Sequence, residues 1–145
     1  MRKYLNSNLN INPRAQPYPR SRHRGQSLVE LALTLPVLLL LLVGVLDLGR
    51  VYFAHMTLTN ASREGARYAT SNPNDTTGIY NHAIAESQGS GIVLTPLSVS
   101  IGCASGCTSG NPVRVTVIYD FQLMTTYLFG GGTIRLSAYT EFVVF

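Results

Sequence analysis

The chain has 145 residues, enough for one small domain with an appendage and too few for two ordinary domains. Its apolar share of 46% is ordinary, but only 12% of its residues are charged, about half the usual share of a globular domain. This composition argues against a plain soluble domain and equally against a disordered chain. The net charge is +4, yet six of the eleven basic residues precede residue 25, where there is no acid. Since the remainder is slightly acidic, the basic balance belongs to a tail and does not indicate a nucleic-acid-binding domain.

Residues 1–25 form the first segment and are rich in Asn, Pro, Arg and Ser. They show neither a helical nor a strand period. Pro13, Pro17 and Pro19 repeatedly interrupt helix. We predict that this segment is an unfolded basic leader.

The second segment is an apolar run, LVELALTLPVLLLLLVGVL (residues 28–46), with Glu30 as its one charge. Its nineteen residues would rise about 28 Å as a helix, close to the roughly 30 Å hydrocarbon core of a bilayer. The remainder of the chain is too small to bury such a helix in a soluble core. We therefore predict a transmembrane helix segment at residues 26–48, in which Pro36 frees the carbonyl of Ala32 and can bend the axis.

The helix is expected to continue past the span, because no strong stop signal follows Asp47. Helix-compatible residues extend until the sequence approaches Pro73. We predict one helix from about Ser27 to Thr70, half in lipid and half outside, with Asp47 and Arg50 paired three residues apart.

The flanks of the span predict its orientation. Basic residues crowd the N-terminal flank, whereas after the span two arginines, Arg50 and Arg63, are balanced by two acids. By the positive-inside bias the leader is cytoplasmic. Residues 49–145 should therefore form an extracytoplasmic domain.

The outer half of the helix carries small residues along part of one flank: Ala54, Ala61, Gly65 and Ala69. Three of them are spaced by four residues, which lets another element approach the backbone closely. Packing inside the domain is the main interpretation of this seam, and a groove for a partner subunit is the alternative. Next to the seam, Glu64 and Arg67 predict a solvated ion pair, with docking as the alternative.

After the long helix the sequence pattern of apolar and polar residues changes twice. Residues 75–88 predict a short second helix that is capped by Asp75 and stopped by Gly89. Beyond it apolar residues alternate, which predicts strands with one buried face each at residues 97–101, 113–121 and 134–142 onward. The fold class is therefore α+β, with the outer half of the long helix covering the apolar face of a small antiparallel sheet.

Cys103 and Cys107 lie in a Gly/Ser-rich connection between two predicted strands. In an oxidising compartment outside the cytoplasm they can close a small disulfide ring, which is the main interpretation. Free thiols are one alternative. A zinc site is another, but it needs two more ligands, and only His55 and His82 remain outside the leader. We expect no metal and no cofactor.

Glu30 is the most informative side chain, because a carboxylate at membrane depth costs about 2.5 to 3.5 kcal/mol unless a partner meets it. Cleavage of the chain after Gly25 would create an α-ammonium on Gln26, about one helical turn from Glu30. A salt bridge from that amine, in the same subunit or a packed neighbour, would set the axial register of helices in lipid. In the alternative, Glu30 snorkels to the cytoplasmic interface as a favourable N-terminal charge.

The N-terminal motifs resemble those of a known family. A basic leader that ends in Gly25, followed by Glu30 and the apolar run, resembles the class III signal of type IV prepilins. The longer stretch RGQSLVELALTLPVLLLLLVGVLDLGR (residues 24–50), followed by TNASREGARY (residues 59–68), resembles the TadE-like family of the tight-adherence pilus machinery. The resemblance covers about residues 24–70, whereas the C-terminal strands fit the family only in pattern.

The resemblance implies a pilin-like fold and a pseudopilin or minor pilin that acts in assembly of a tight-adherence (Flp-type) pilus or a related secretion apparatus. It implies that an inner-membrane aspartyl prepilin peptidase cuts after Gly25, that Gln26 becomes the N-terminus, and that Glu30 is the assembly carboxylate. The implied partners are this peptidase, other pilins or Tad assembly proteins, and the lipid bilayer of the bacterial cytoplasmic membrane.

Three other functions compete with this one. The main alternative is an uncleaved single-pass module that binds an envelope protein through its sheet. A secreted protein is disfavoured because the apolar run exceeds a typical signal-peptide core of roughly 7 to 15 residues. An enzyme is disfavoured because the sequence lacks the spacing of a catalytic triad, paired catalytic carboxylates and a phosphate-binding loop. We expect no small-molecule substrate and no nucleic-acid partner, since a basic leader alone would act by electrostatics and vanish on cleavage.

Overall fold

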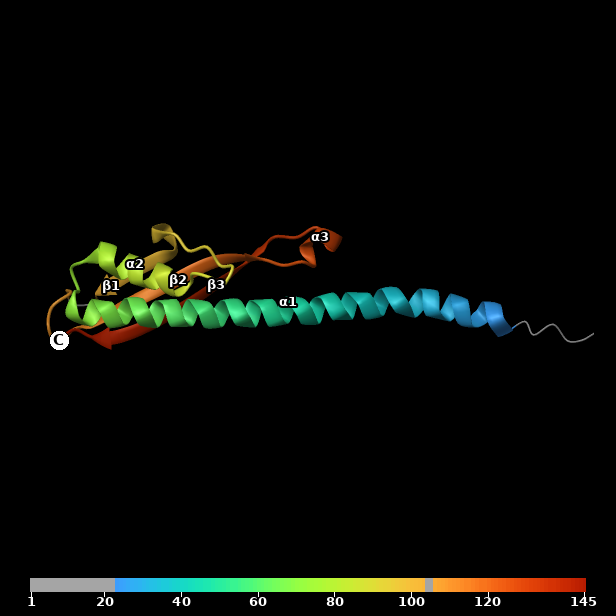
Figure 1. Cartoon of the computed structure of the whole chain (residues 1–145), viewed down its shortest axis with the longest axis horizontal. Coiled ribbons are helices and arrows are strands. Elements are labelled where there is room, and N and C mark those ends of the chain that lie inside the picture. Colours follow the sequence, from blue (N-terminus) through green and yellow to red (C-terminus); the bar gives the residue numbers. More distant parts are fainter. Residues whose placement is uncertain (1–22, 104–105) are drawn as a thin grey trace, which may run out of the picture. The chain divides into compact units, whose positions relative to one another are not determined.

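The computed structural model describes residues 23–103 and 106–145 (Figure 1). The chain divides into two compact units, Met1–Pro36 and Val37–Phe145. The prediction of an unfolded leader falls mainly on residues 1–22, which lie outside the described residues.

Helix α1 (His23–Ser71) has 49 residues and contains Pro36. Its end agrees with the prediction to within one residue, but it starts at His23 and not at Ser27. The last residues assigned to the unfolded leader are therefore helical. The physical reason is that neither a proline nor a turn sequence lies between Pro19 and the apolar run, and that Gly25 costs a helix only about 1 kcal/mol relative to Ala.

Helix α2 (Thr76–Glu86) confirms the predicted second helix, with slightly narrower bounds. Asp75 caps it, because its carboxylate accepts a hydrogen bond from the Gly78 N–H at 2.9 Å and another from the Tyr68 hydroxyl at 2.8 Å. These donors hold the pKa of Asp75 below its ordinary value, since both stabilise the charged form. Because Tyr68 belongs to α1, the cap also ties the start of α2 to the long helix.

Three strands, β1 (Val99–Cys103), β2 (Pro112–Gln122) and β3 (Thr133–Val143), form one antiparallel sheet in the order β1-β2-β3. Val117 of the central strand pairs with Val99 on one side and with Ala138 on the other. The predicted strands are confirmed, except that the first begins at Val99 and not at Leu97. The preceding residues instead form the 3-10 helix η1 (Pro96–Ser98), because proline favours the first position of a helical turn.

The connection between β2 and β3 contains a further helix, α3 (Thr126–Phe129), which the sequence does not predict. We call residues 123–132 the hairpin tip. Within the second unit, the tip stands at the end of the sheet opposite the C-terminus of the chain (Figure 1).

The core of the second unit lies between one face of the sheet and the helices α1 and α2. Its fully buried apolar side chains include Leu58, Ile79, Val113, Val115 and Val117. A polar contact crosses the same interface, because Ser62 Oγ on α1 lies 2.9 Å from Thr140 Oγ1 on β3. The α+β class is therefore confirmed.

The seam of small residues on α1 packs inside this core. Its three alanines are buried. At Gly65 a Cβ would lie 3.2 Å from Ala83 Cβ and 3.2 Å from Val115 Cγ1, so α2 and β2 both approach the backbone closely. The packing interpretation is confirmed, and the domain itself fills the space that a partner subunit would need.

Charged side chains pair on the surface of the second unit. Across β2 and β3, Arg114 lies 2.8 Å from Glu141, and Arg135 lies 3.0 Å from Asp120. On α1 the predicted pair of Glu64 and Arg67 is confirmed: Arg67 Nε donates to Glu64 Oε2 at 2.8 Å, which lowers the pKa of Glu64. Exposed pairs of this kind contribute about 1 kcal/mol or less.

The two cysteines form a disulfide, and the Cα atoms of Cys103 and Cys107 are 5.3 Å apart. Of the alternatives that the sequence left open, the disulfide is therefore the one found. The bond links the end of β1 to the connection that leads into β2.

Candidate functional site

The motif behind the functional prediction lies in the first unit, on the surface of α1. Gly25, Gln26 and Glu30 are all helical and exposed. Among the described residues, a Cβ placed on Gly25 would meet no atom within 4 Å apart from its sequence neighbours and its own helix backbone. The surface of the helix at the predicted cleavage point is therefore exposed, although the bond itself lies in helical backbone.

Glu30 stands alone as a charge within the apolar run. Its backbone carbonyl accepts a hydrogen bond from the Thr34 hydroxyl at 3.0 Å. Its carboxylate takes part in none of the ion pairs found within residues 25–103 and 106–145. Because Gln26 and Glu30 are about one turn apart on the same helix, an amine formed at Gln26 would lie within reach of the carboxylate.

Exposed apolar side chains surround Glu30 and continue along the helix, among them Leu28, Val29, Leu31, Leu33 and Leu35. Within the described residues, α1 is the one helix long and apolar enough to cross a membrane, and none of its most apolar stretch is buried inside the protein. An apolar surface of this length needs lipid or the helix of another subunit to cover it.

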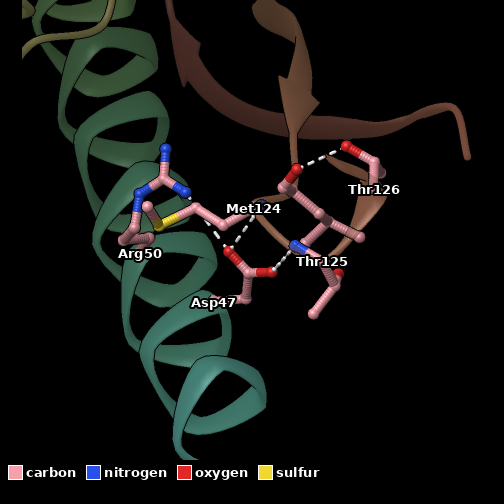
Figure 2. Close-up of polar contacts among 6 residues, drawn as sticks. Asp47, Arg50, Met124, Thr125 and Thr126 are labelled. Carbon is pink, nitrogen blue, oxygen red and sulfur yellow. Dashed lines mark hydrogen bonds and ion pairs between the residues drawn. The ribbon is translucent and has the colours of Figure 1, made fainter. Parts of the chain in front are cut away.

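Asp47, at the end of the apolar run, is buried although it belongs to the same helix, with an exposed fraction of 4%. Its Oδ1 accepts the Met124 N–H at 2.9 Å, and its Oδ2 accepts the Thr125 N–H at 2.8 Å (Figure 2). Arg50, about one turn further along α1, donates through Nη1 to Oδ1 at 3.2 Å. The carboxylate thus receives three donors, two of them backbone amides of the hairpin tip.

Arg50 is held from two sides. The predicted pair with Asp47 is confirmed, and the guanidinium carbon lies 5.0 Å from the centre of the Phe121 ring on β2, close enough for a cation–π contact. Beside Arg50 lies a groove of about 730 Å³ in which Arg50 is the one Asp, Glu, Lys, Arg or His side chain.

The hairpin tip has the local structure that directs two successive amides toward Asp47. The Tyr127 N–H donates to the Met124 carbonyl at 3.1 Å, and the Gly130 N–H donates to the Thr126 carbonyl at 2.9 Å. Gly130 then leaves the helix with a φ of 65°, a conformation that favours glycine. The tip is thus a compact turn that is hydrogen-bonded both to itself and to α1.

Sequence reasoning identified Asp47 only as the partner of Arg50. The sequence held one further indication, because a carboxylate at the end of an apolar run needs hydrogen-bond donors. The donors themselves are backbone amides, which every residue except proline carries. The sequence therefore indicates that Asp47 needs partners, but it does not identify them.

One family is similar to this chain. The model of the family described as TadE-like protein matches residues 25–67, which confirms the resemblance seen in the motifs. No curated protein and no solved structure matches the chain. The matched segment contains Gly25, Gln26, Glu30 and Asp47 and ends before α2 and the sheet. It supports a protein related to the tight-adherence pilus with an apolar N-terminal helix.

Proposed function

From the TadE-like match over residues 25–67, we propose that the protein is a membrane-anchored pseudopilin or minor pilin of a tight-adherence (Flp-type) pilus or a related secretion apparatus. The leader, residues 1–25, lies in the cytoplasm and is removed after Gly25. Residues 26–48 span the bacterial cytoplasmic membrane, and residues 49–145 form the extracytoplasmic domain. The observation that carries the proposal is Glu30, an exposed carboxylate on an otherwise apolar helix surface.

Removal of the leader supplies the charge that Glu30 requires. Hydrolysis of the Gly25–Gln26 peptide bond consumes one water and leaves a carboxylate on Gly25 and a free amine on Gln26. An α-amino group in water ordinarily carries a proton at neutral pH. The ammonium lies about 6 Å along the helix axis from Glu30. It can therefore pair with Glu30 of its own subunit or of a packed neighbour.

The pairing gives the protein a role in assembly. Apolar helices sliding in lipid have little to define their axial register, because all apolar contacts are nearly equivalent. A pair between the new N-terminus of one subunit and Glu30 of another is formed only at one register. The partners are accordingly a prepilin peptidase, other pilins or Tad assembly proteins, and the bilayer, and the protein itself performs no catalysis.

An uncleaved, single-pass envelope module remains the second candidate, and one observation favours it. The Gly25–Gln26 bond lies in helical backbone, because α1 begins at His23. The peptidase would have to unwind the first turn to reach the bond. This turn has no acidic residue to stabilise it, so unwinding is inexpensive in free energy.

Cleavage is tested by Gly25→Leu, with Gly44→Leu as the matched control. Both positions lie on α1, and at both a Cβ would meet no atom within 4 Å. N-terminal sequencing of protein recovered from membranes should find Gln26 first in the wild type and in Gly44→Leu. It should find Met1 first in Gly25→Leu and in a strain without the peptidase. Met1 at the start of the wild-type protein would establish the uncleaved module instead.

Assembly is tested by Glu30→Ala, which should be cleaved normally but enter assemblies poorly. The variant leaves the new ammonium unpaired in lipid at a cost of about 2.5 to 3.5 kcal/mol, so assembly should fall by on the order of 100-fold. The measurement is the amount of protein in sheared pili, or cross-linked to other pilins, relative to the membrane pool. The exposed Glu86→Ala on α2 is the control. Normal assembly of Glu30→Ala would remove Glu30 from the proposed role.

A further inference from the structure

We propose that the hairpin tip, residues 123–132, is a second membrane contact that lies in the outer membrane–water interface and touches lipid through Met124 and Tyr127. The proposal rests on the proposed function, because it requires α1 to span the bilayer. The occupant of this surface is the lipid bilayer itself.

Asp47 sets the depth of the tip. The apolar run ends at residue 46, so Asp47 is the first charged residue on the outer side of the span. The amides of Met124 and Thr125 bond directly to its carboxylate, at 2.9 and 2.8 Å. Groups joined by a hydrogen bond lie at nearly the same depth in the membrane. The tip therefore begins where the hydrocarbon core ends, and its side chains reach the headgroup region.

The composition of the tip suits that position. No Asp, Glu, Lys or Arg occurs between Asp120 and Arg135, although the strands on both sides carry ion pairs. Tyr127 is 80% exposed and Met124 is 49% exposed, so the domain core does not account for either side chain. Tyrosine is enriched at membrane interfaces, because its ring is apolar while its hydroxyl can remain hydrated.

Helix α1 presents similar side chains at nearly the same level. Leu48 and Tyr52 are exposed and follow Asp47 within about 8 Å along the axis. Both lie on a different side of the helix from Asp47, because successive residues are rotated by about 100°. Tyr52 and the tip residue Tyr127 would thus form an interfacial belt that meets lipid on two sides of the helix.

Two membrane contacts restrict the domain more than one does. A domain attached through a single helix can tilt relative to the membrane plane, because it has no other contact with lipid. An additional contact at the tip restricts that tilt, because tilting would lift Tyr127 out of the interface or push it into the hydrocarbon. The extracytoplasmic domain would then meet its assembly partners at one tilt relative to the membrane.

The chain contains no tryptophan, so a single introduced tryptophan reports only its own surroundings. Full-length variants are reconstituted in phosphatidylcholine vesicles in which part of the lipid carries bromine near the top of the acyl chains, where it quenches nearby tryptophan fluorescence. Tyr127→Trp tests the tip, and Leu40→Trp, inside the apolar run, tests the span. Phe145→Trp is the control, because Phe145 is 89% exposed and its N–H bonds to the Thr70 carbonyl, about 35 Å along α1 from Asp47.

Bromolipid should quench Tyr127→Trp and Leu40→Trp and leave Phe145→Trp unchanged. Quenching of Leu40→Trp without quenching of Tyr127→Trp would overturn the second contact and leave the proposed function standing. Unquenched Leu40→Trp would overturn the membrane span, and both proposals with it. Quenching of Phe145→Trp as strong as that of Tyr127→Trp would overturn a contact confined to the tip.

Discussion

Replacement of Asp47 by alanine should release the hairpin tip from α1 and destabilise the extracytoplasmic domain by about 3 kcal/mol. The carboxylate accepts hydrogen bonds from two backbone amides and from Arg50. Each hydrogen bond to a charged group contributes about 1.5 to 3 kcal/mol. Because Asp47 is buried, water can replace the missing acceptor only in part, and the amides of Met124 and Thr125 lose most of this stabilisation.

Two measurements on the full-length protein in detergent check this expectation. Amide hydrogen exchange should become fast at Met124 and Thr125, and the denaturation midpoint should fall. Asp47→Asn, which keeps one acceptor oxygen, should be intermediate. Asp120→Ala removes a carboxylate from an exposed pair with Arg135 and should cost about 1 kcal/mol or less. Slow exchange retained at both amides in Asp47→Ala would contradict the tether.

Enlarging Gly65 should have an effect at least as large, because two other elements touch the helix there. A Cβ at this position would already lie 3.2 Å from Ala83 Cβ and from Val115 Cγ1, and Gly65→Leu adds three further carbons. Overpacking a well-filled core costs about 1 to 3 kcal/mol and sometimes more, and we expect about 3 kcal/mol or more here. Gly65→Ala should be nearly neutral, since the tight contact is offset by up to about 1 kcal/mol of helix propensity.

The test is chemical denaturation of the full-length variants in detergent, followed by near-ultraviolet circular dichroism. Gly44→Leu serves again as the control, because it makes the same change on the same helix where an added Cβ would meet no other described element within 4 Å. It should leave the midpoint unchanged, whereas Gly65→Leu should lower it strongly. Equal midpoints for the two variants would mean that α1 does not pack against α2 and β2 at Gly65.

Most helices and strands and the N-terminal motif could be predicted because each depends on a local pattern of residues in the sequence. The extent of α1 followed from an apolar run, the lack of a stop signal and a break near Pro73, and the structure differs mainly in starting at His23. The strands followed from alternation, and α2 from its cap at Asp75. The motif at Gly25 and Glu30, which the family match covers, needs only spacing along one helix. None of these features depends on residues far apart in the sequence.

The sequence by itself therefore determined the α+β class, the long apolar helix and the TadE-like motif, because composition, period and spacing are properties of neighbouring residues. Only the tertiary structure decided what Asp47 and Gly65 contact. The amides that bind Asp47 lie 77 and 78 residues away and look like any other amides in the sequence. A helix as short as α3 has too few residues to show a period. The small residues beside Gly65 would have the same spacing whether they packed inside the domain or against a partner, and the fold alone distinguishes the two.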